Sequence, residues 1–540
     1  MQNRPPIRPG QDLAAWLSLA ALPACFVAAA LAARSAGGPT WLWFNLDPDY
    51  FYLLDALNIV NLTTPGHVYH PGTTVEWLAA LVLKAAHPFD AGAAIAAQVL
   101  ADPEHHLRLI GDFFIVLGAL ALLAVGVVGR RVFGGLTAPW LLQMAPFLSM
   151  VILKQSYRVK PESLLVLTTL ALIAVATLTL EPGLMERHRR RFAVGFGVIA
   201  GFGVATKITA LPVFLLPVFL LGGPRWIALY AASAFAALIV FTLPAAGAYD
   251  AFFAWMTKVS LASSAYGGGP AGVIDWARYP AGVAKLVRRP AFVLPLALGV
   301  LALAWAAWRR NDGRPLPAPE VRLIAGIVAA QLAHVLMVAK QPNAIYLIPS
   351  LALSALAIVG LWRLAAAIVG EGAGARRLER GMAALLALLL VAQTAGVVGL
   401  ARGLADDRDR ALAVDDGRFR ACARVYSYSA SSPSFALMLG DFMTGSRFAD
   451  KLAGILPAND YWLEHWWDQS RVVFRAARGP ADMTATLARY PCAVLRGGHG
   501  PLIKTFLGAL APGLSFDATC STRDETIFVS GAGCEGRPGR

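Results

Sequence analysis

Charged residues are scarce in this sequence: Asp, Glu, Lys and Arg together make up only 15% of its 540 residues. Soluble domains carry about 25% charged residues, and the mean hydropathy of +0.57 points the same way. This deficit excludes an ordinary soluble globular protein. It predicts a chain that lies mostly within a lipid bilayer.

Cysteine is also rare, with five residues in the chain. Cys25 lies in the first apolar run, and the other four are Cys422, Cys492, Cys520 and Cys534. Because none of the spacings is CxxC, a structural zinc site is not expected. An even number of cysteines on an exported segment favours disulfides. Of the three possible pairings we favour Cys422–Cys492 with Cys520–Cys534.

The sequence has no internal repeat and no long low-complexity segment. Its formal net charge is +14, but Lys and Arg occur in short clusters between apolar runs rather than along one helix face. Nucleic acid is therefore not expected as a partner. We interpret the basic excess as a topology signal and as affinity for lipid phosphates.

Apolar runs dominate the chain up to about residue 402. The first, at 13–33, continues past Cys25 and lacks the short core and cleavage site of a signal peptide, so we expect it to be retained. Further runs lie at 107–128, 136–153, 162–180, 192–206, 208–222, 226–247, 291–308, 322–339, 343–362 and 381–401. The sequence predicts about eleven transmembrane helices.

The distribution of basic residues predicts the orientation. With the N-terminus in the cytoplasm, the clusters that fall inside are 130–131, 186–191, 225, 309–314 and 376–380. The loops 34–105 and 248–290 and the tail from 403 then face outward. The segment 73–87 is too short to span and is predicted to lie along the interface. This pattern is compatible with a bacterial inner membrane whose external side is the periplasm.

The tail differs in composition from the rest of the chain. Strand-like pieces at 424–430, 492–497 and 526–530 alternate with helical patterns at 434–444 and 501–511, which predicts a small α/β domain. The expected organisation is an all-α polytopic membrane domain at 1–402, including both external loops, and an external α/β domain at 403–540.

A polar stretch at 44–72 follows the first apolar run and reads FNLDPDYFYLLDALNIVNLTTPGHVYHPG. Asp49 could accept a proton from an attacking hydroxyl, with Asp47 assisting it. Asp47 could instead cap a helix that starts near Asp49, and the whole stretch could be a solvated loop. The other candidate substrate-binding residues here are Asp55, His67 and His70.

Cations recur at the predicted external ends of the apolar runs. They are Lys154, Arg158 and Lys160 beside Glu162 in KQSYRVKPES, Lys207 in GVATKITALP, and Lys340 in VAKQPNAIYLIP. Long basic side chains often reach from helix ends to the interface, but positive charge on the external side runs against the usual bias. A lipid phosphate would supply the missing negative charge at headgroup depth.

The order of four motifs resembles the GT-C class of integral-membrane glycosyltransferases, especially the branch with protein O-mannosyltransferases and lipid A aminoarabinose transferases. The resemblance covers most of residues 10–400. The motifs are LDPDY at 46–50, RVKPES at 158–163, GFGVATKITALP at 201–212 and AKQPNAIYLIP at 339–349. It implies transfer of a sugar from a polyprenyl-phosphate donor to an acceptor at the external membrane face.

The resemblance also implies roles for residues. Asp49 would be the general base, with Asp47 as an alternative or helper; the family's acidic pair is adjacent or nearly so, whereas Pro48 separates this one, so the choice stays open. The donor phosphate would be held by Lys154, Arg158, Lys160, Lys207 and Lys340. Lesser candidates for orienting sugar or phosphate are Glu162, His67, His70 and Tyr346.

Two questions stay open from the sequence. Some members of the class use a divalent cation and others do not, and the acceptable ligand types here are Asp47, Asp49, His67 and His70. The acceptor is a glycan, a lipid or a protein, and the sugar is not specified.

Three rival functions remain: a glycan ligase or polymerase with a lipid-linked donor, a transporter or flippase for a lipid-linked sugar, and a noncatalytic scaffold. The lack of repeat halves argues against a transporter.

Overall fold

The computed structural model describes residues 9–311, 316–414, 417, 419–465, 472–498, 500–510, 516, 518–522 and 524–531, with backbone alone at 9–12, 46–48, 465, 502, 507–510, 518 and 520–521. Its contacts divide the chain into two compact units. Unit 1 comprises Met1–Ala33, Val68–Val75 and Gly111–Leu400; unit 2 comprises Arg34–His67, Glu76–Ile110 and Ala401–Arg540. The segment 34–105, predicted to be the first external loop, is thus divided, and most of it groups with the tail.

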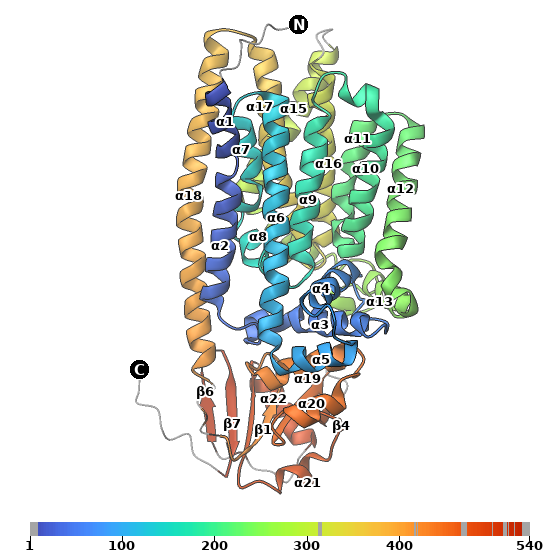
Figure 1. The fold of residues 1–540 in the computed structure, drawn as a ribbon, viewed down its shortest axis with the longest axis vertical. Helices are drawn as coiled ribbons and strands as arrows, with labels where there is room; N and C mark the ends of the chain where they lie inside the picture. Colours follow the sequence, from blue (N-terminus) through green and yellow to red (C-terminus); the bar gives the residue numbers. More distant parts are fainter. Residues whose placement is uncertain are drawn as a thin grey trace. The chain divides into compact units, whose positions relative to one another are not determined.

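Unit 1 is a bundle of long helices that run side by side (Figure 1). Within the described ranges, eight helical segments are long and apolar enough to cross a membrane. They are Leu13–Gly37, Pro103–Phe133 (α6), Pro161–Leu178 (α9), Pro224–Leu261, Pro290–Asn311 (α15), Ala318–Val338 (α16), Ala344–Val369 and Ala373–Leu412 (α18). Some of these contain two elements: α1 (Pro9–Ser18) with α2 (Ala21–Gly37), α12 (Pro224–Thr242) with α13 (Tyr249–Leu261), and a short turn with α17 (Ile348–Val369). The protein is a multi-pass membrane protein, as predicted.

Three predicted spans have a different form. The run at 136–153 is not one helix but α7 (Thr137–Gln143), a 3-10 turn at Ala145–Phe147 and α8 (Met150–Gln155). Pro146 lies at this break, and proline removes a backbone donor and clashes with the preceding turn. The run at 192–206 belongs to α10 (Leu184–Thr206), and the run at 208–222 is the 3-10 helix η2 (Ile208–Leu215) followed by α11 (Leu216–Leu221). The two runs around Lys207 are therefore separate segments.

The loop part of unit 2 is helical. It contains α3 (Trp43–Val60), most of α4 (Thr73–Ala86) and α5 (Gly92–Ala101). Because α3 begins at Trp43, the backbone of Asp47 lies inside the helix, so the idea that Asp47 caps a helix starting near Asp49 is wrong. The 14 residues of α4 are too few to cross a bilayer, as expected.

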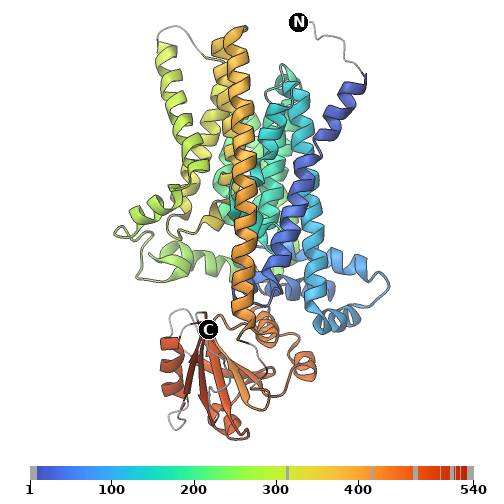
Figure 2. The same cartoon turned by 90° about the vertical axis from the view of Figure 1, so that its left-hand side faces the viewer.

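The tail of unit 2 folds around one mixed sheet (Figure 2). Its strand order is β4-β3-β2-β1-β5-β7-β6, with β1 parallel to both β2 and β5 and the other pairs antiparallel. The strands are β1 (Ala423–Tyr426), β2 (Asp460–His465), β3 (Val472–Ala476), β4 (Gly479–Pro480), β5 (Ala493–Gly497), β6 (Ala518–Ser521) and β7 (Thr526–Ser530). The helices are α19 (Pro433–Met443), α20 (Ala449–Ile455), α21 (Met483–Leu487) and α22 (Gly500–Leu510). The small α/β domain expected from the sequence is present.

Apolar side chains cover both faces of this sheet. On one face Val425 and Leu495 share a core with Ile503 of α22. On the other, the ring of Phe435 in α19 lies 6.2 Å from that of Tyr426, measured between centroids. Successive strand residues point to opposite faces, so the neighbours Val425 and Tyr426 serve the two layers.

Within unit 2, the segment 34–67 packs against the tail through α3 and α19. Gly440 in α19 permits this approach, because a Cβ there would lie 2.7 Å from Cδ1 of Leu54. A Cβ on Gly66 would lie 2.5 Å from the backbone carbon of Thr444. Two glycines far apart in sequence thus allow close contact within unit 2.

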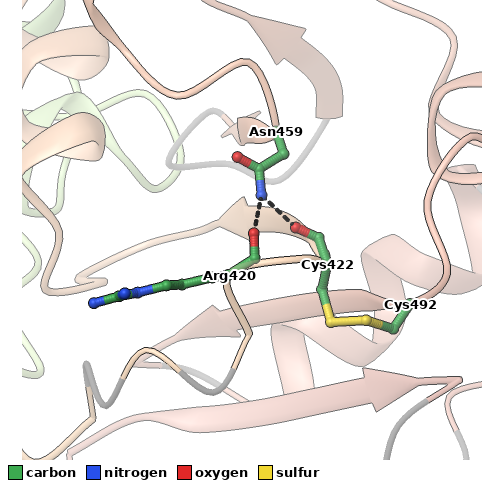
Figure 3. Close-up of a disulfide and its surroundings, with 4 residues drawn as sticks. All are labelled: Arg420, Cys422, Asn459 and Cys492. Carbon is green, nitrogen blue, oxygen red and sulfur yellow. Dashed lines mark hydrogen bonds between the residues drawn. A yellow bond between two sulfur atoms is a disulfide. The ribbon is translucent and has the colours of Figure 1, made fainter.

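A disulfide joins Cys422 to Cys492 across 70 residues of sequence. Asn459 donates hydrogen bonds to the carbonyl oxygens of Arg420 and Cys422, at 2.9 and 2.6 Å, and so orders the chain that leads into β1 (Figure 3). This disulfide confirms the first predicted pair. The second predicted pair, Cys520–Cys534, lies outside the described side chains.

Replacing Cys422 and Cys492 together with Ser is expected to lower the free energy of unfolding of unit 2 by about 2–4 kcal/mol, since the bond closes a long loop in the unfolded chain. Chemical denaturation without reductant would measure this. Cys25→Ser is the matched control, because Cys25 forms no disulfide. Equal stability of the double variant and Cys25→Ser would contradict the prediction.

Candidate functional site

Lys207 lies where a helix of unit 1 stops. α10 ends at Thr206, and Lys207 adopts an extended conformation with φ −162° and ψ 122°. A Cβ on Gly203 would collide with the ring of Phe214, so this glycine allows η2 to fold back closely on α10. The Gly-rich run of the motif therefore serves packing and brings Lys207 to a sharp change in chain direction.

The sequence HPGTT at residues 70–74 holds this turn. Pro71 and Lys207 form an antiparallel bridge, and the Ile208 amide donates to the His70 carbonyl at 2.8 Å. The hydroxyls of Thr74 and Thr206 lie 2.7 Å apart. Residues 70–74 thus clamp the backbone on both sides of Lys207, and no local feature of the sequence disclosed this pairing.

The Lys207 side chain is buried against a carboxylate. Its Nζ donates to Oε1 of Glu162 at 2.5 Å and lies 4.8 Å from the centroid of the Tyr346 ring. Lys207 is 6% exposed and Glu162 is 2% exposed. Three motifs that are distant in sequence, those with Glu162, Lys207 and Tyr346, therefore meet in unit 1.

Lys160 lies next to this pair. It is the extended residue before α9, whose first position is Pro161, and its positive charge acts on the Glu162 carboxylate. Lys160 is 6% exposed, and Arg158, two residues earlier, is 2% exposed. Arg158, Lys160 and Lys207 are thus all buried cations. The N-terminus of α9 adds the partial positive charge of a helix dipole.

The remaining predicted cations of unit 1 are placed differently. Lys340 donates from Nζ to the carbonyl oxygens of Val259 and Ser260, at 2.5 and 3.4 Å, in the last turn of α13. Partial burial lowers the pKa of Lys340. Lys154 is half-buried at the end of α8. Lys340 thus holds the loop 248–290, and its predicted contact with a phosphate stays a prediction.

Tyr266 of that same loop was not among the predicted residues. Its hydroxyl lies 3.0 Å from the hydroxyl of Tyr346, the ring that covers Lys207. Tyr266 has a left-handed backbone conformation with φ 54°, which is unfavourable for an aromatic residue. The loop therefore places a strained tyrosine beside Tyr346, whose ring covers Lys207.

In unit 2, Asp49 is buried in α3 with 1% of its surface exposed. The next residue, Tyr50, donates from its hydroxyl to Oε1 of Glu104 at 2.9 Å. Glu104 also accepts from the backbone amides of Thr40 and Trp41, at 2.8 and 3.2 Å. These bonds fix the start of α3, which carries Asp49. The Asp47 side chain lies outside the described residues.

Asp55 anchors the chain that returns after α3. Its carboxylate accepts from the amides of Gly66 and His67, both at 2.8 Å, and from Asn58 Nδ2 at 2.9 Å. The same Asn58 nitrogen donates to the Thr444 carbonyl at 3.1 Å, which links the loop to the tail. The described contacts of Asp55 are thus structural, whereas its predicted role was in binding substrate.

His67 and Glu76 are two further buried polar residues of unit 2. The His67 ring contacts those of Phe51 and Tyr52, with centroids 5.1 and 5.5 Å apart. Glu76 is fully buried, and neither carboxyl oxygen has a hydrogen-bond partner in the part of the chain that the structure describes. Burial, with the Asp55 charge second, raises the pKa of Glu76 well above its usual value.

The stability of unit 2 is expected to depend on pH through Asp55. Burial raises the pKa of Asp55 from 3.8 to about 7, against the lowering effect of its hydrogen bonds. Between these values the folded chain binds a proton that the unfolded chain does not, so stability should fall by up to a few kcal/mol as pH rises from about 4 to 7. Thermal unfolding across this range would measure the slope.

Two variants isolate the Asp55 contribution. Asp55→Asn does not titrate at this position and should give a shallower slope than the wild type, with the buried Glu76 contributing to the slope that remains, whereas Asp450→Asn, at a carboxylate that is 94% exposed, should keep the full slope. The same slope in wild type and Asp55→Asn would contradict the assignment.

The predicted metal ligands do not form a cluster in the described side chains. No group of three or more His, Cys, Asp or Glu residues there is placed to hold a metal ion. His67 belongs to unit 2, whereas His70 belongs to unit 1 and uses its carbonyl to hold the Lys207 turn. A divalent cation stays an untested prediction.

No protein-family model matches this sequence, and no curated protein does either. Among solved structures the chain is similar to the crystal structure of ArnT from Cupriavidus metallidurans bound to undecaprenyl phosphate. The identity is 16%, the alignment covers 94% of this chain and 97% of that chain, and the TM-score is 0.46. ArnT is a lipid A aminoarabinose transferase of the GT-C class, which is the class that the sequence motifs resemble. A similarity at this level supports no individual residue's role, which depends on the contacts within this chain.

Proposed function

We propose that this protein is a glycosyltransferase that moves a sugar from a polyprenyl-phosphate donor to an acceptor hydroxyl at the periplasmic face of a bacterial inner membrane. The observation that carries the proposal is the buried Glu162–Lys207 pair, with Lys160 beside it and Tyr346 over it. Buried ionisable residues in a membrane protein mark ion and substrate sites, and a cation there suits an anionic ligand. A lipid phosphate provides that charge while its tail stays in the membrane.

The three buried cations Lys207, Lys160 and Arg158 would act on the leaving group. As the bond between the sugar's anomeric carbon and the phosphate oxygen breaks, the electron pair stays on that oxygen and negative charge grows there. Lys207, Lys160 and Arg158 would stabilise this charge, and donors fixed before the reaction act most strongly on charge that develops in the transition state. Glu162 and Tyr346 would hold Lys207 in place, and Lys154 would bind the outer part of the phosphate.

Asp49 would serve the other half of the reaction. A carboxylate that takes the acceptor's hydroxyl proton makes the oxygen a better nucleophile as it attacks the anomeric carbon. Asp49 is buried and lies on a helix whose start is tied down by Glu104, so its position is well defined within unit 2. The products are the glycosylated acceptor and the polyprenyl phosphate.

The test is transfer by the purified full-length protein in proteoliposomes with labelled polyprenyl-phosphate sugars and a panel of lipid, glycan and peptide acceptors. We expect release of polyprenyl phosphate and appearance of the label on one acceptor class. Movement of the intact donor from one leaflet of the vesicle membrane to the other, without cleavage of its sugar–phosphate bond, would contradict the proposal and favour a flippase. Turnover only with a preassembled glycan donor would favour a ligase or polymerase.

A further inference from the structure

Two histidines of unit 2 face each other through ring nitrogens, and the proposed function uses neither. His87 follows α4, and His106 lies near the start of α6. Their Nε2 atoms are 3.2 Å apart, and the rings are stacked with centroids 5.4 Å apart. His106 is 5% exposed and the His87 side chain 18%. The pair is thus mostly enclosed and reached from the His87 side.

The partners of the other ring nitrogens determine what the two Nε2 atoms carry. Nδ1 of His106 lies 2.8 Å from the carbonyl oxygen of Asp102. Nδ1 of His87 lies 3.4 Å from Oδ2 of Asp90. A carbonyl oxygen only accepts hydrogen bonds, so Nδ1 of His106 carries the hydrogen, and the nearby Asp90 carboxylate favours the same tautomer in His87. In that tautomer both Nε2 atoms present lone pairs to each other, which repel unless a proton or a metal ion lies between them.

The geometry fits a metal ion in that place. Tetrahedral zinc with Zn–N bonds of about 2.0–2.1 Å separates two imidazole nitrogens by about 3.3 Å. Metal-binding histidines usually donate their other ring N–H to a carbonyl or a carboxylate, and this pair has one of each. We propose that His87 and His106 form a binding site for a borderline divalent transition-metal ion, with Zn²⁺ the best fit.

The surroundings fix the ligands and set the charge. Gln98 donates to Oδ2 of Asp90 at 2.9 Å, and Lys84 donates to the Asp90 carbonyl at 2.6 Å, so the segment between α4 and α5 is ordered. The exposed ring of His105 lies 5.2 Å from that of His106, between centroids. The ionisable groups around the pair are thus His105, Asp90, Asp102 and Lys84.

The site would join the end of α4 to the start of α6. Since no third His, Cys, Asp or Glu is in place among the described side chains, water or a third ligand that moves in would complete the coordination. The function of such a site is to hold the external loop, and it is independent of whether the protein transfers a sugar.

Metal content tests the proposal directly. Full-length protein purified with a tag that contains no histidine would be stripped with chelator, incubated with Zn²⁺, desalted and analysed by mass spectrometry. We expect about one Zn²⁺ per chain in the wild type and loss of that ion in His87→Gln and in His106→Gln. His105→Gln is the matched control and should keep the ion. Absence of bound Zn²⁺ in the wild type, or equal loss in His105→Gln, would overturn the proposal and leave a shared proton in its place.

Affinity and stability give a readout that a misfolded variant cannot imitate. Asp90→Asn should weaken Zn²⁺ binding about 10–100-fold, because Asp90 orients His87. Zn²⁺ should bind more tightly in the wild type as pH rises from about 5 to 8, since protons compete for the imidazoles. Zn²⁺ should also raise the Tm of the wild type and of His105→Gln but not that of His106→Gln. An equal rise in all three would contradict the site.

Discussion

Asp49→Asn is expected to reduce sugar transfer by about 10²–10⁴-fold, the usual contribution of a general base. The amide has nearly the same shape as the carboxylate but does not accept a proton from the acceptor hydroxyl. Because the change is isosteric at a residue that is 1% exposed, we expect the variant to insert and fold normally. Initial rates in proteoliposomes, compared at equal amounts of monodisperse protein, would measure the loss.

Asp47→Asn and Asp55→Asn are the controls for the choice of base, since both lie on the same helix as Asp49. Asp55→Asn should change the pH dependence of stability more than the rate of transfer, because its carboxylate holds Gly66, His67 and Asn58. If Asp49→Asn keeps wild-type activity while either control loses it, the assignment of Asp49 is wrong.

Lys207→Ala is expected to weaken use of the polyprenyl-phosphate donor by about 10²-fold or more, which is the usual cost of losing one preorganised group at a developing negative charge. The effect on expression should be smaller. The variant should also be less stable, since Glu162 would then be a buried carboxylate without its hydrogen-bonded partner at 2.5 Å. Removing one member of a buried pair costs about 3–5 kcal/mol of stability.

A double variant separates the two effects. Lys207→Met with Glu162→Leu removes both charges and should recover much of the stability, because a buried pair can often be replaced by apolar residues without loss. Its transfer activity should stay low, since the phosphate still lacks its cation. Recovery of activity together with stability would show that Lys207 has a structural role only.

The sequence was informative where the pattern is local. Long apolar runs predicted the helices of unit 1, and alternating strands and helices predicted β1, β5, β7, α19 and α22 close to their observed bounds. Motif order also selected Glu162, Lys207 and Tyr346, which the fold brings into contact. Each of these predictions depends on hydropathy or on a family motif, and both can be recognised in a short stretch of sequence.

The features that were missed depend on contacts between distant residues. The bond between Thr74 and Thr206 joins residues 132 positions apart. The contact of Gly66 with Thr444 depends on the packing of α3 against α19. Neither contact produces a periodic pattern in the sequence from which it could be predicted. Asp55 shows a related limit, since a buried carboxylate that orders backbone amides has the same letter as one that binds substrate, and its role in binding substrate stays a prediction.

The grouping of residues 34–67 and 76–110 with the tail has a practical consequence for dissecting this protein. A fragment cut at residue 403, where composition changes, would carry α19 without α3, the helix that it packs against. The side of α19 around Gly440, which meets Leu54 and Tyr50, would be bare, and such apolar surfaces cause aggregation. A water-soluble version therefore needs residues 34–67 spliced onto the tail, so that two stretches separated by most of the membrane domain are expressed as one piece.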